Sequence, residues 1–323
     1  MLESISLNLG GLVTDALKDP DVIEIMLNPD GCLWVEKFGQ PMTEVGFISS
    51  IQAEAALSLI ASAQKATLSR ECPILEGLVP LDNSRIEGLL SPIVASVAFA
   101  IRKKASKIFT FEEYIQAGIL ATEARDILED LVTNRQNLLV AGCAGAGKST
   151  FINAVIEAIA RLTPNDRLII IEDVGEIQSS SRNRVELSTT DFVDMERLLK
   201  VTLRLRPDRI IVGEVRDVAA LALLKAWNTG HQGGLVTLHA NNAPEAMIRL
   251  EELIAEGHYL PQKSVLARAI NYIVFINKDH RGIRRVTEIA RVGYDKEMMD
   301  YAFNFLYRYF PESPDSFEQS TAA

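Results

Sequence analysis

A glycine-rich stretch from Gly142 to Thr150, GCAGAGKST, ends in a lysine followed by two hydroxyl residues. It comes directly after the apolar run NLLVAG and directly before the amphipathic run FINAVIEAIARL. Between a strand and a helix, such glycines let backbone N–H groups converge on an anion, and the start of the helix adds partial positive charge. The spacing G-x-x-x-x-G-K-[ST] therefore predicts a loop that binds the phosphates of a nucleotide, with a plain glycine turn as the weaker alternative.

The parts of this loop have distinct expected contacts with ATP. Lys148 is expected to reach the β- and γ-phosphates, and the hydroxyl of Ser149 to ligate Mg²⁺. The loop residues expected to bind the nucleotide are Gly142, Cys143, Ala144, Gly145, Ala146, Gly147, Lys148, Ser149 and Thr150.

Two later apolar runs end in carboxylates. RLIIIEDVGE supplies Glu172, Asp173 and Glu176, and RIIVGEVRD supplies Glu214, with Arg216 and Asp217 just beyond it. In a parallel sheet these ends meet at one edge, where a carboxylate can hold Mg²⁺ through water or orient the attacking water. We assign the second role to Glu214 and keep Glu172 and Glu176 as catalytic candidates. Helix capping or solvation is the alternative for each acid, and Asp217 is better interpreted as a helix cap.

The stretch TGHQGGLVTLHANN contains His231 and His239. A zinc site would need a third protein ligand, and the chain has no cysteine near either histidine. His239 ends the predicted strand 234–240, at the edge where Lys148 and Glu214 gather, so we expect it to contact the γ-phosphate region or the catalytic water. His231 stands at the entry to that strand and either contacts the nucleotide or braces the loop, and a purely structural loop remains the alternative.

The elements that must position these residues divide the chain in two. Residues 1–106 read as an α+β domain, with a turn at Pro29–Gly31 between two alternating segments. Residues 107–310 alternate strand and helix, which predicts a largely parallel α/β sheet, and residues 311–323 read as a disordered tail. The predicted N-terminal elements are a helical start, a helix at about 51–69 and one or two strands within 84–104. The later predicted strands are 137–142, 167–173, 209–215 and 234–240, the predicted helices are 148–161, 192–205, 217–229 and 244–256, and a closing hairpin pairs 272–278 with 284–292 around residues 279–282.

Composition limits the classes of function. The 323 residues carry a formal charge of −10, which argues against broad binding of nucleic acid. The three cysteines, in no C-x-x-C pattern, indicate neither disulfides nor a structural zinc and fit a reducing cytoplasm. The longest apolar run, 89–101, is too short to span a bilayer, so we expect a soluble protein that can still dock on a membrane complex.

Four stretches, in chain order, carry a resemblance: GCAGAGKST, RLIIIEDVGEIQ, LRLRPDRIIVGEVRD and TGHQGGLVTLHANN. Together they resemble the Walker A loop, Asp box, atypical Walker B motif and His box of the traffic ATPases of type II and type IV secretion systems. The chain is most similar to the conjugal-transfer ATPases of TrbB type, because it is short and has no tetracysteine zinc element.

The resemblance implies an N-terminal α+β domain followed by a RecA-like P-loop ATPase domain. It further implies a homohexamer in which ATP and Mg²⁺ are held between the two domains. Arginines of the N-terminal domain are then expected to touch the phosphates. Arg85 and Arg102 lie where the family has these arginines, and a guanidinium there compensates transition-state charge. Exposed salt-bridge arginines are the alternative.

These expectations describe a Mg-ATP-hydrolysing hexameric motor for a conjugative type IV secretion system, acting in pilus assembly or substrate transfer. We expect it in the cytoplasm, peripheral on the cytoplasmic face of the inner membrane, with inner-membrane components of the machine as partners. One alternative is an assembly or retraction ATPase of a type IV pilus or type II system. Another class, a nucleic-acid translocase, is disfavoured by the acidic charge, and a scaffold that barely hydrolyses is disfavoured by Glu214 and the two arginines.

Overall fold

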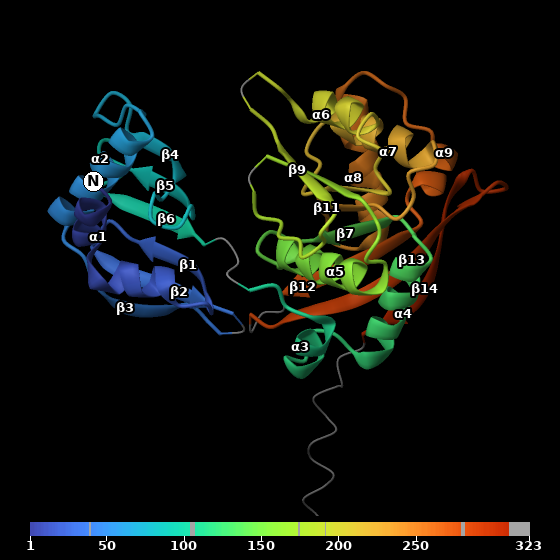
Figure 1. The fold of residues 1–323 in the computed structure, drawn as a ribbon, viewed down its shortest axis with the longest axis horizontal. Helices are drawn as coiled ribbons and strands as arrows, with labels where there is room; N and C mark the ends of the chain where they lie inside the picture. Colours follow the sequence, from blue (N-terminus) through green and yellow to red (C-terminus); the bar gives the residue numbers. More distant parts are fainter. Residues whose placement is uncertain (39, 104–106, 174, 191, 279–281, 310–323) are drawn as a thin grey trace, which may run out of the picture. The chain divides into compact units, whose positions relative to one another are not determined.

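The structure, a computed structural model, describes residues 1–38, 40–103, 107–173, 175–190, 192–278 and 282–309 (Figure 1). It consists of two compact units, Met1–Lys107 and Ile108–Ala323. The predicted disordered tail, 311–323, and most of the predicted hairpin turn, 279–281, lie outside the described residues. None of the described helices is long and apolar enough to cross a bilayer.

The N-terminal unit is a six-stranded antiparallel sheet against which two helices pack. Apolar residues such as Ile5 and Leu57 on the helices meet Ile25 and Ile86 on the strands in one core. The sheet order is β3-β2-β1-β6-β5-β4. The elements are α1 (Leu2–Lys18), β1 (Val22–Leu27), β2 (Cys32–Lys37), β3 (Thr43–Phe47), α2 (Ser50–Ala63), β4 (Ile74–Leu78), β5 (Arg85–Leu89) and β6 (Ala98–Arg102).

The second unit is built on an eight-stranded sheet of order β14-β13-β12-β7-β11-β10-β8-β9, whose last six strands are parallel. The antiparallel pair β13 and β14 closes one edge. Its strands are β7 (Leu138–Gly142), β8 (Leu168–Glu172), β9 (Arg184–Ser188), β10 (Arg209–Val212), β11 (Leu235–His239), β12 (Tyr272–Lys278), β13 (Arg284–Asp295) and β14 (Asp300–Arg308). Its helices are α3 (Phe111–Gln116), α4 (Thr122–Thr133), α5 (Lys148–Leu162), α6 (Met195–Thr202), α7 (Ala219–Asn228), α8 (Ala243–Glu256) and α9 (Lys263–Ala269).

The four strands predicted from continuous apolar runs, β7, β8, β10 and β11, are buried along their whole length except at His239. Helices α6 to α9 share one core with one face of these strands, and α5 packs on β7 and β11 beside α4. Strands covered on both faces must be apolar at every position, which is why their sequences do not alternate. The exposed end at His239 marks the edge where chemistry is possible.

Several elements differ from the prediction. The predicted strand 209–215 ends at Val212, and the predicted helix 192–205 begins only at Met195, where the Asp194 side chain accepts a hydrogen bond from the backbone N–H of Arg197. The edge strands β3 and β4 were not predicted, because most of their residues are exposed and neither has an apolar run. The elements α3, α4, β9, α9 and β14 were also not predicted.

Candidate nucleotide site

The phosphate loop joins β7 to α5, and its glycines are required by geometry. Gly145 has a φ of 70° and Gly147 a φ of 90°, a region that side chains with a Cβ rarely adopt. At Gly142 a Cβ would lie 2.2 Å from the carbonyl oxygen of Ile276. Gly147 is also the N-cap of α5 and offers no side chain to its first N–H groups. A bound phosphate would satisfy these donors, so the loop fits a nucleotide.

Lys148, the first residue of α5, is buried against the loop that precedes it. Its Nζ donates to the carbonyl oxygen of Gly142 at 2.9 Å and to that of Cys143 at 3.1 Å. The same nitrogen lies 3.1 Å from Nδ1 of His239. Lys148 is therefore held between the ends of β7 and β11, where its charge faces the phosphate loop.

A line of side chains continues from Lys148 across the sheet edge. Nε2 of His239 lies 3.0 Å from Oε1 of Glu214. Oε2 of Glu214 accepts hydrogen bonds from Arg216, at 2.6 Å from Nη2 and 2.9 Å from Nε. Because an ammonium can only donate, Nδ1 of a neutral His239 must accept from Lys148, and the ring proton on Nε2 then faces Glu214. We call Lys148, His239, Glu214 and Arg216 the edge network.

Strand order explains why residues up to 91 positions apart form this network. His239 is paired with Gly142 in the β11–β7 ladder, and Glu214 follows β10, the strand on the other side of β11. The carboxyl ends of β7, β11 and β10 therefore lie together, as the sequence predicts for a parallel sheet. The structure thus brings together the predicted residues Lys148, His239 and Glu214.

Glu172 ends β8, the strand next to β10 in the sheet. Its carboxylate holds the backbone of the segment that follows β8. Its Oε2 accepts hydrogen bonds from the backbone N–H of Glu176 at 2.9 Å and of Ile177 at 2.8 Å. Glu176 itself is half-buried. Asp217 accepts from the backbone N–H of Ala219 at 2.8 Å just before α7, whose N-cap is Val218, so it stands one residue before the cap position predicted for it.

The structure does not bring His231 to the phosphate loop of its own chain. His231 lies before the amino end of β11, whereas His239 lies at the carboxyl end of the same strand. Its Nδ1 is 3.3 Å from the carbonyl oxygen of Pro207, on the segment that leads into β10. The contact matches the bracing alternative, since it joins the beginnings of two neighbouring strands.

Arg85 and Arg102 belong to the N-terminal unit. They are directly opposite each other in the β5–β6 ladder, and both are exposed. Arg102 is also opposite Glu24 in the β1–β6 ladder. The two arginines therefore lie on one face of one sheet, and their contact with a nucleotide stays a prediction.

Arg284, the first residue of β13, lies at the phosphate loop and was not predicted. Its Nε donates to the carbonyl oxygen of Gly145 at 3.2 Å, and its Cδ lies 3.2 Å from where a Cβ of Gly147 would be. The basic run around the closing hairpin, NKDHRGIRR, was the available signal. That signal is weak, because only the pairing of β12 with β7 places the hairpin beside the loop.

Mg²⁺ is held in nucleotide sites by few protein ligands and mainly by phosphates and water. Among the described residues, no group of three or more His, Cys, Asp and Glu is arranged to hold a metal ion. Ser149, in the first turn of α5, and the carboxylates that end or follow β8 and β10 supply oxygen ligands of the kind that Mg²⁺ takes. This donor set suits a hard cation that arrives with its nucleotide.

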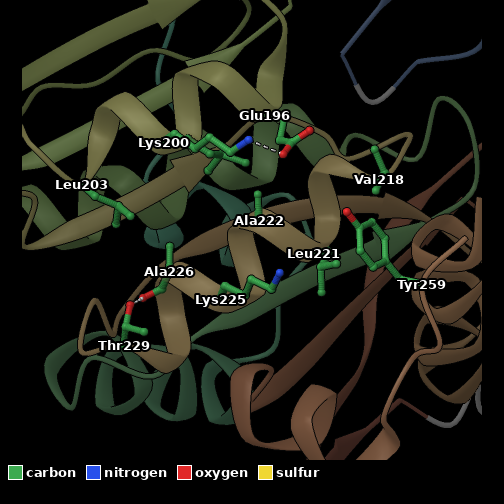
Figure 2. Close-up of a pocket in the computed structure, with 11 residues that line it drawn as sticks. Glu196, Lys200, Leu203, Val218, Leu221, Ala222, Lys225, Ala226, Thr229 and Tyr259 are labelled. Atoms are coloured by element: carbon green, nitrogen blue, oxygen red, sulfur yellow. Dashed lines mark hydrogen bonds and ion pairs between the residues drawn. The ribbon is translucent and has the colours of Figure 1, made fainter. Parts of the chain in front are cut away.

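A separate hollow lies between α6 and α7 (Figure 2). Its lining includes the apolar residues Leu199 and Leu221 and the basic residues Lys200 and Lys225. Its volume is about 210 Å³, below the roughly 300–1,000 Å³ of ordinary small-molecule sites. None of the edge network lines it, so it is not the nucleotide site.

Comparison with known proteins agrees with this geometry. The chain is 45% identical over 284 residues to "Probable conjugal transfer protein TrbB" of Sinorhizobium fredii, covering 88% of this chain and 87% of that protein. It is 44% identical over 288 residues to "Conjugal transfer protein TrbB" of Rhizobium radiobacter, covering 89% of each. The structure of the "Pilus Retraction Motor PilT and Bound ADP" shares the fold, with a TM-score of 0.59, 20% identity and coverage of 93% and 82%.

The resemblance inferred from the four motifs is thereby confirmed, together with the fold class of an N-terminal α+β domain and a RecA-like P-loop ATPase domain. Residues 18–278, most of the chain, match the family described as "Type II/IV secretion system protein". This chain belongs to the type II/IV secretion system protein family.

Proposed function

We propose that this chain is a Mg-ATP-hydrolysing motor that energises a conjugative type IV secretion system. The observation that carries the proposal is the edge network, in which the phosphate-loop lysine is linked through His239 to the Glu214 carboxylate. A phosphate loop alone supports binding. A carboxylate on the neighbouring strand end adds a group that can orient a water molecule for attack on the terminal phosphate.

The residues divide the work as follows. Lys148 exchanges the carbonyl oxygens of Gly142 and Cys143 for phosphate oxygens, and Ser149 donates its hydroxyl oxygen to the cation. Mg²⁺, when bound, neutralises charge on the phosphates. Glu214 orients the water. His239 contacts both Lys148 and Glu214 and so couples the position of the lysine to that of the carboxylate. We further infer that Arg85 and Arg102 compensate charge in the transition state.

The assembly and location are parts of the same proposal. The TrbB relatives support conjugal transfer as the process. We infer a homohexamer, located in the cytoplasm on the cytoplasmic face of the inner membrane, with membrane components of the machine as partners. Closure of the N-terminal domain on ATP and its release after hydrolysis would convert each turnover into rigid-body motion.

Glu214→Gln is the primary test, because it keeps the shape of the side chain and removes its charge. We expect binding of a fluorescent ATP analogue within about twofold of the wild type and phosphate release lowered by at least about 100-fold. Glu252→Gln, an exposed glutamate on α8, is the matched control. Lys148→Ala should lose binding or turnover. Wild-type turnover by Glu214→Gln would refute the assigned mechanism, and plasmid transfer unaffected by deletion of the gene would refute the conjugative role.

A further inference from the structure

Arg216 makes the strongest contact with the proposed catalytic carboxylate. Two of its nitrogens, Nη2 and Nε, donate to the same oxygen of Glu214 at 2.6 and 2.9 Å. His239 faces the other oxygen at 3.0 Å. Both oxygens of Glu214 are thus occupied by protein groups, although Arg216 itself is 61% exposed and so can move.

This pairing opposes the task proposed for Glu214. A carboxylate that orients water needs a lone pair free to accept from that water. The two donors of the guanidinium take the acceptor sites of one oxygen, and His239 faces the other oxygen. While Arg216 is bound, Glu214 therefore has few acceptor sites left and a fixed orientation, so its release by Arg216 favours the reaction.

A second carboxylate, that of Asp173, follows β8, the strand beside β10, and its charge acts on Arg216. The backbone N–H of Gly213 donates to the carbonyl oxygen of Ile171 at 2.9 Å, so the residues that follow β8 and β10 run side by side. Asp173 is exposed there, and its Oδ1 accepts from the Thr189 hydroxyl at 2.9 Å. The pKa of Arg216 is raised, first by its hydrogen bond to Glu214; burial opposes this shift, and the charges of Glu214, Asp173 and Glu176 each add a smaller upward effect.

We propose that Arg216 is a positioning residue. Its two hydrogen bonds restrain the Glu214 carboxylate, and the guanidinium moves to the Asp173 carboxylate when Glu214 accepts a hydrogen bond from the attacking water. Arg216 then sets the fraction of time for which Glu214 is able to orient the water. The guanidinium charge is paired with a carboxylate in either position, on Glu214 or on Asp173. The inference rests on the proposed ATPase function and adds a control element to it.

The first experiment measures phosphate release by Arg216→Ala and Arg216→Lys. Ion pairs at exposed positions contribute about 0.2–1 kcal/mol, so Arg216→Ala is expected to raise kcat about two- to fivefold with KM for ATP unchanged. Arg216→Lys keeps the positive charge but cannot donate from two nitrogens in the same way, so its kcat should lie between those of Arg216→Ala and the wild type. Arg249→Ala removes a guanidinium paired to glutamates on α8 and serves as the control, with kcat unchanged.

The second experiment tests Asp173 as the alternative partner through a double-mutant cycle. Asp173→Asn should lower kcat about two- to fivefold in the wild type, because Arg216 then stays on Glu214. In the Arg216→Ala background the same change should have no effect. If Asp173 acts on the cation instead, the loss persists in both backgrounds, and the exchange between carboxylates is refuted.

A fall in kcat for Arg216→Ala, with ATP binding retained, would overturn the restraint and make Arg216 part of the catalytic machinery. That failure differs from failure of the proposed function, in which the wild type itself would release no phosphate above Lys148→Ala. Circular dichroism of each variant separates both results from misfolding.

Discussion

Nζ of Lys148 and Nδ1 of His239 lie 3.1 Å apart, so the cation of the phosphate loop and the histidine at the end of β11 share one hydrogen bond. The lysine must leave this contact, at least in part, when it binds phosphates. The imidazole then loses a donor while its other nitrogen still faces Glu214 at 3.0 Å. His239 is therefore suited to couple phosphate binding by Lys148 to the position of the Glu214 carboxylate.

The first prediction is that His239→Asn uncouples binding from turnover. The shorter amide cannot reach Lys148 and Glu214 together, so kcat should fall by about 10- to 100-fold while ATP affinity changes less than about threefold. Phosphate release and analogue binding, measured on the same preparation, check both values. His258→Asn, an exposed histidine in the loop after α8, should leave both unchanged. Equal losses in affinity and kcat would place His239 in binding rather than coupling.

The second prediction concerns Arg284, whose guanidinium contacts the Gly145 carbonyl. Arg284→Ala removes a positive charge from the rim of the loop and frees that carbonyl, so we expect nucleotide affinity to fall about two- to fivefold with a smaller change in kcat. Arg285→Ala is the control, because the next residue along β13 donates instead to the Gly118 carbonyl, at 2.9 Å. If Arg285→Ala weakens binding as much, general charge and not the loop contact is responsible.

The parts of the fold that the sequence predicted are those whose burial dictates composition. The buried strands β7, β8, β10 and β11 have continuous apolar runs because both of their faces are covered. β14 alternates between exposed and half-buried residues along its whole length, so no apolar run marked it. α4 has an apolar face but no side-chain cap at Ala121, so its beginning had no signal.

The candidate site shows the same division. Lys148, Glu214 and His239 end or follow strands, and the rule for parallel sheets places such ends together without knowledge of the strand order. Arg284 required the order itself, because β13 reaches the phosphate loop only through β12. His231 precedes β11 and so lies at the other end of that strand, where its contact with the Pro207 carbonyl fits the bracing alternative, and a contact with nucleotide stays a prediction.

The third prediction concerns the stability of the second unit at the amino end of β10. Arg209 is 1% exposed, and its Nε donates to Asp166 Oδ2 at 2.6 Å. Asp166→Ala would leave a buried guanidinium without its carboxylate, which costs about 3–5 kcal/mol. Urea unfolding followed by Trp227 fluorescence in a Trp34→Phe background reports on this unit. Asp126→Ala, which removes an exposed aspartate from its pair with the half-buried Arg125, should cost under about 1 kcal/mol. Similar losses for the two would contradict a special role for burial.

The fourth prediction decides between the two interpretations of Arg85 and Arg102. If they compensate phosphate charge, Arg85→Ala and Arg102→Ala should each lower kcat by at least about tenfold without loss of folding stability. Arg70→Ala, which removes an exposed arginine from the same unit, is the control. Loss of activity no greater than that of Arg70→Ala would leave both residues as surface arginines.

Mixing two inactive variants then tests whether Arg102 acts on the nucleotide bound by its own chain or on that bound by a neighbouring chain. Chains with Arg102→Ala keep an intact edge network, and chains with Glu214→Gln keep an intact arginine. If Arg102 acts on the nucleotide of a neighbouring chain, a mixture of the two inactive variants forms some complete sites and recovers phosphate release, with a maximum near equal amounts. If it acts within its own chain, every site in the mixture lacks one group and no activity returns. Either result requires that the chains exchange, which mass photometry of differently tagged chains measures directly.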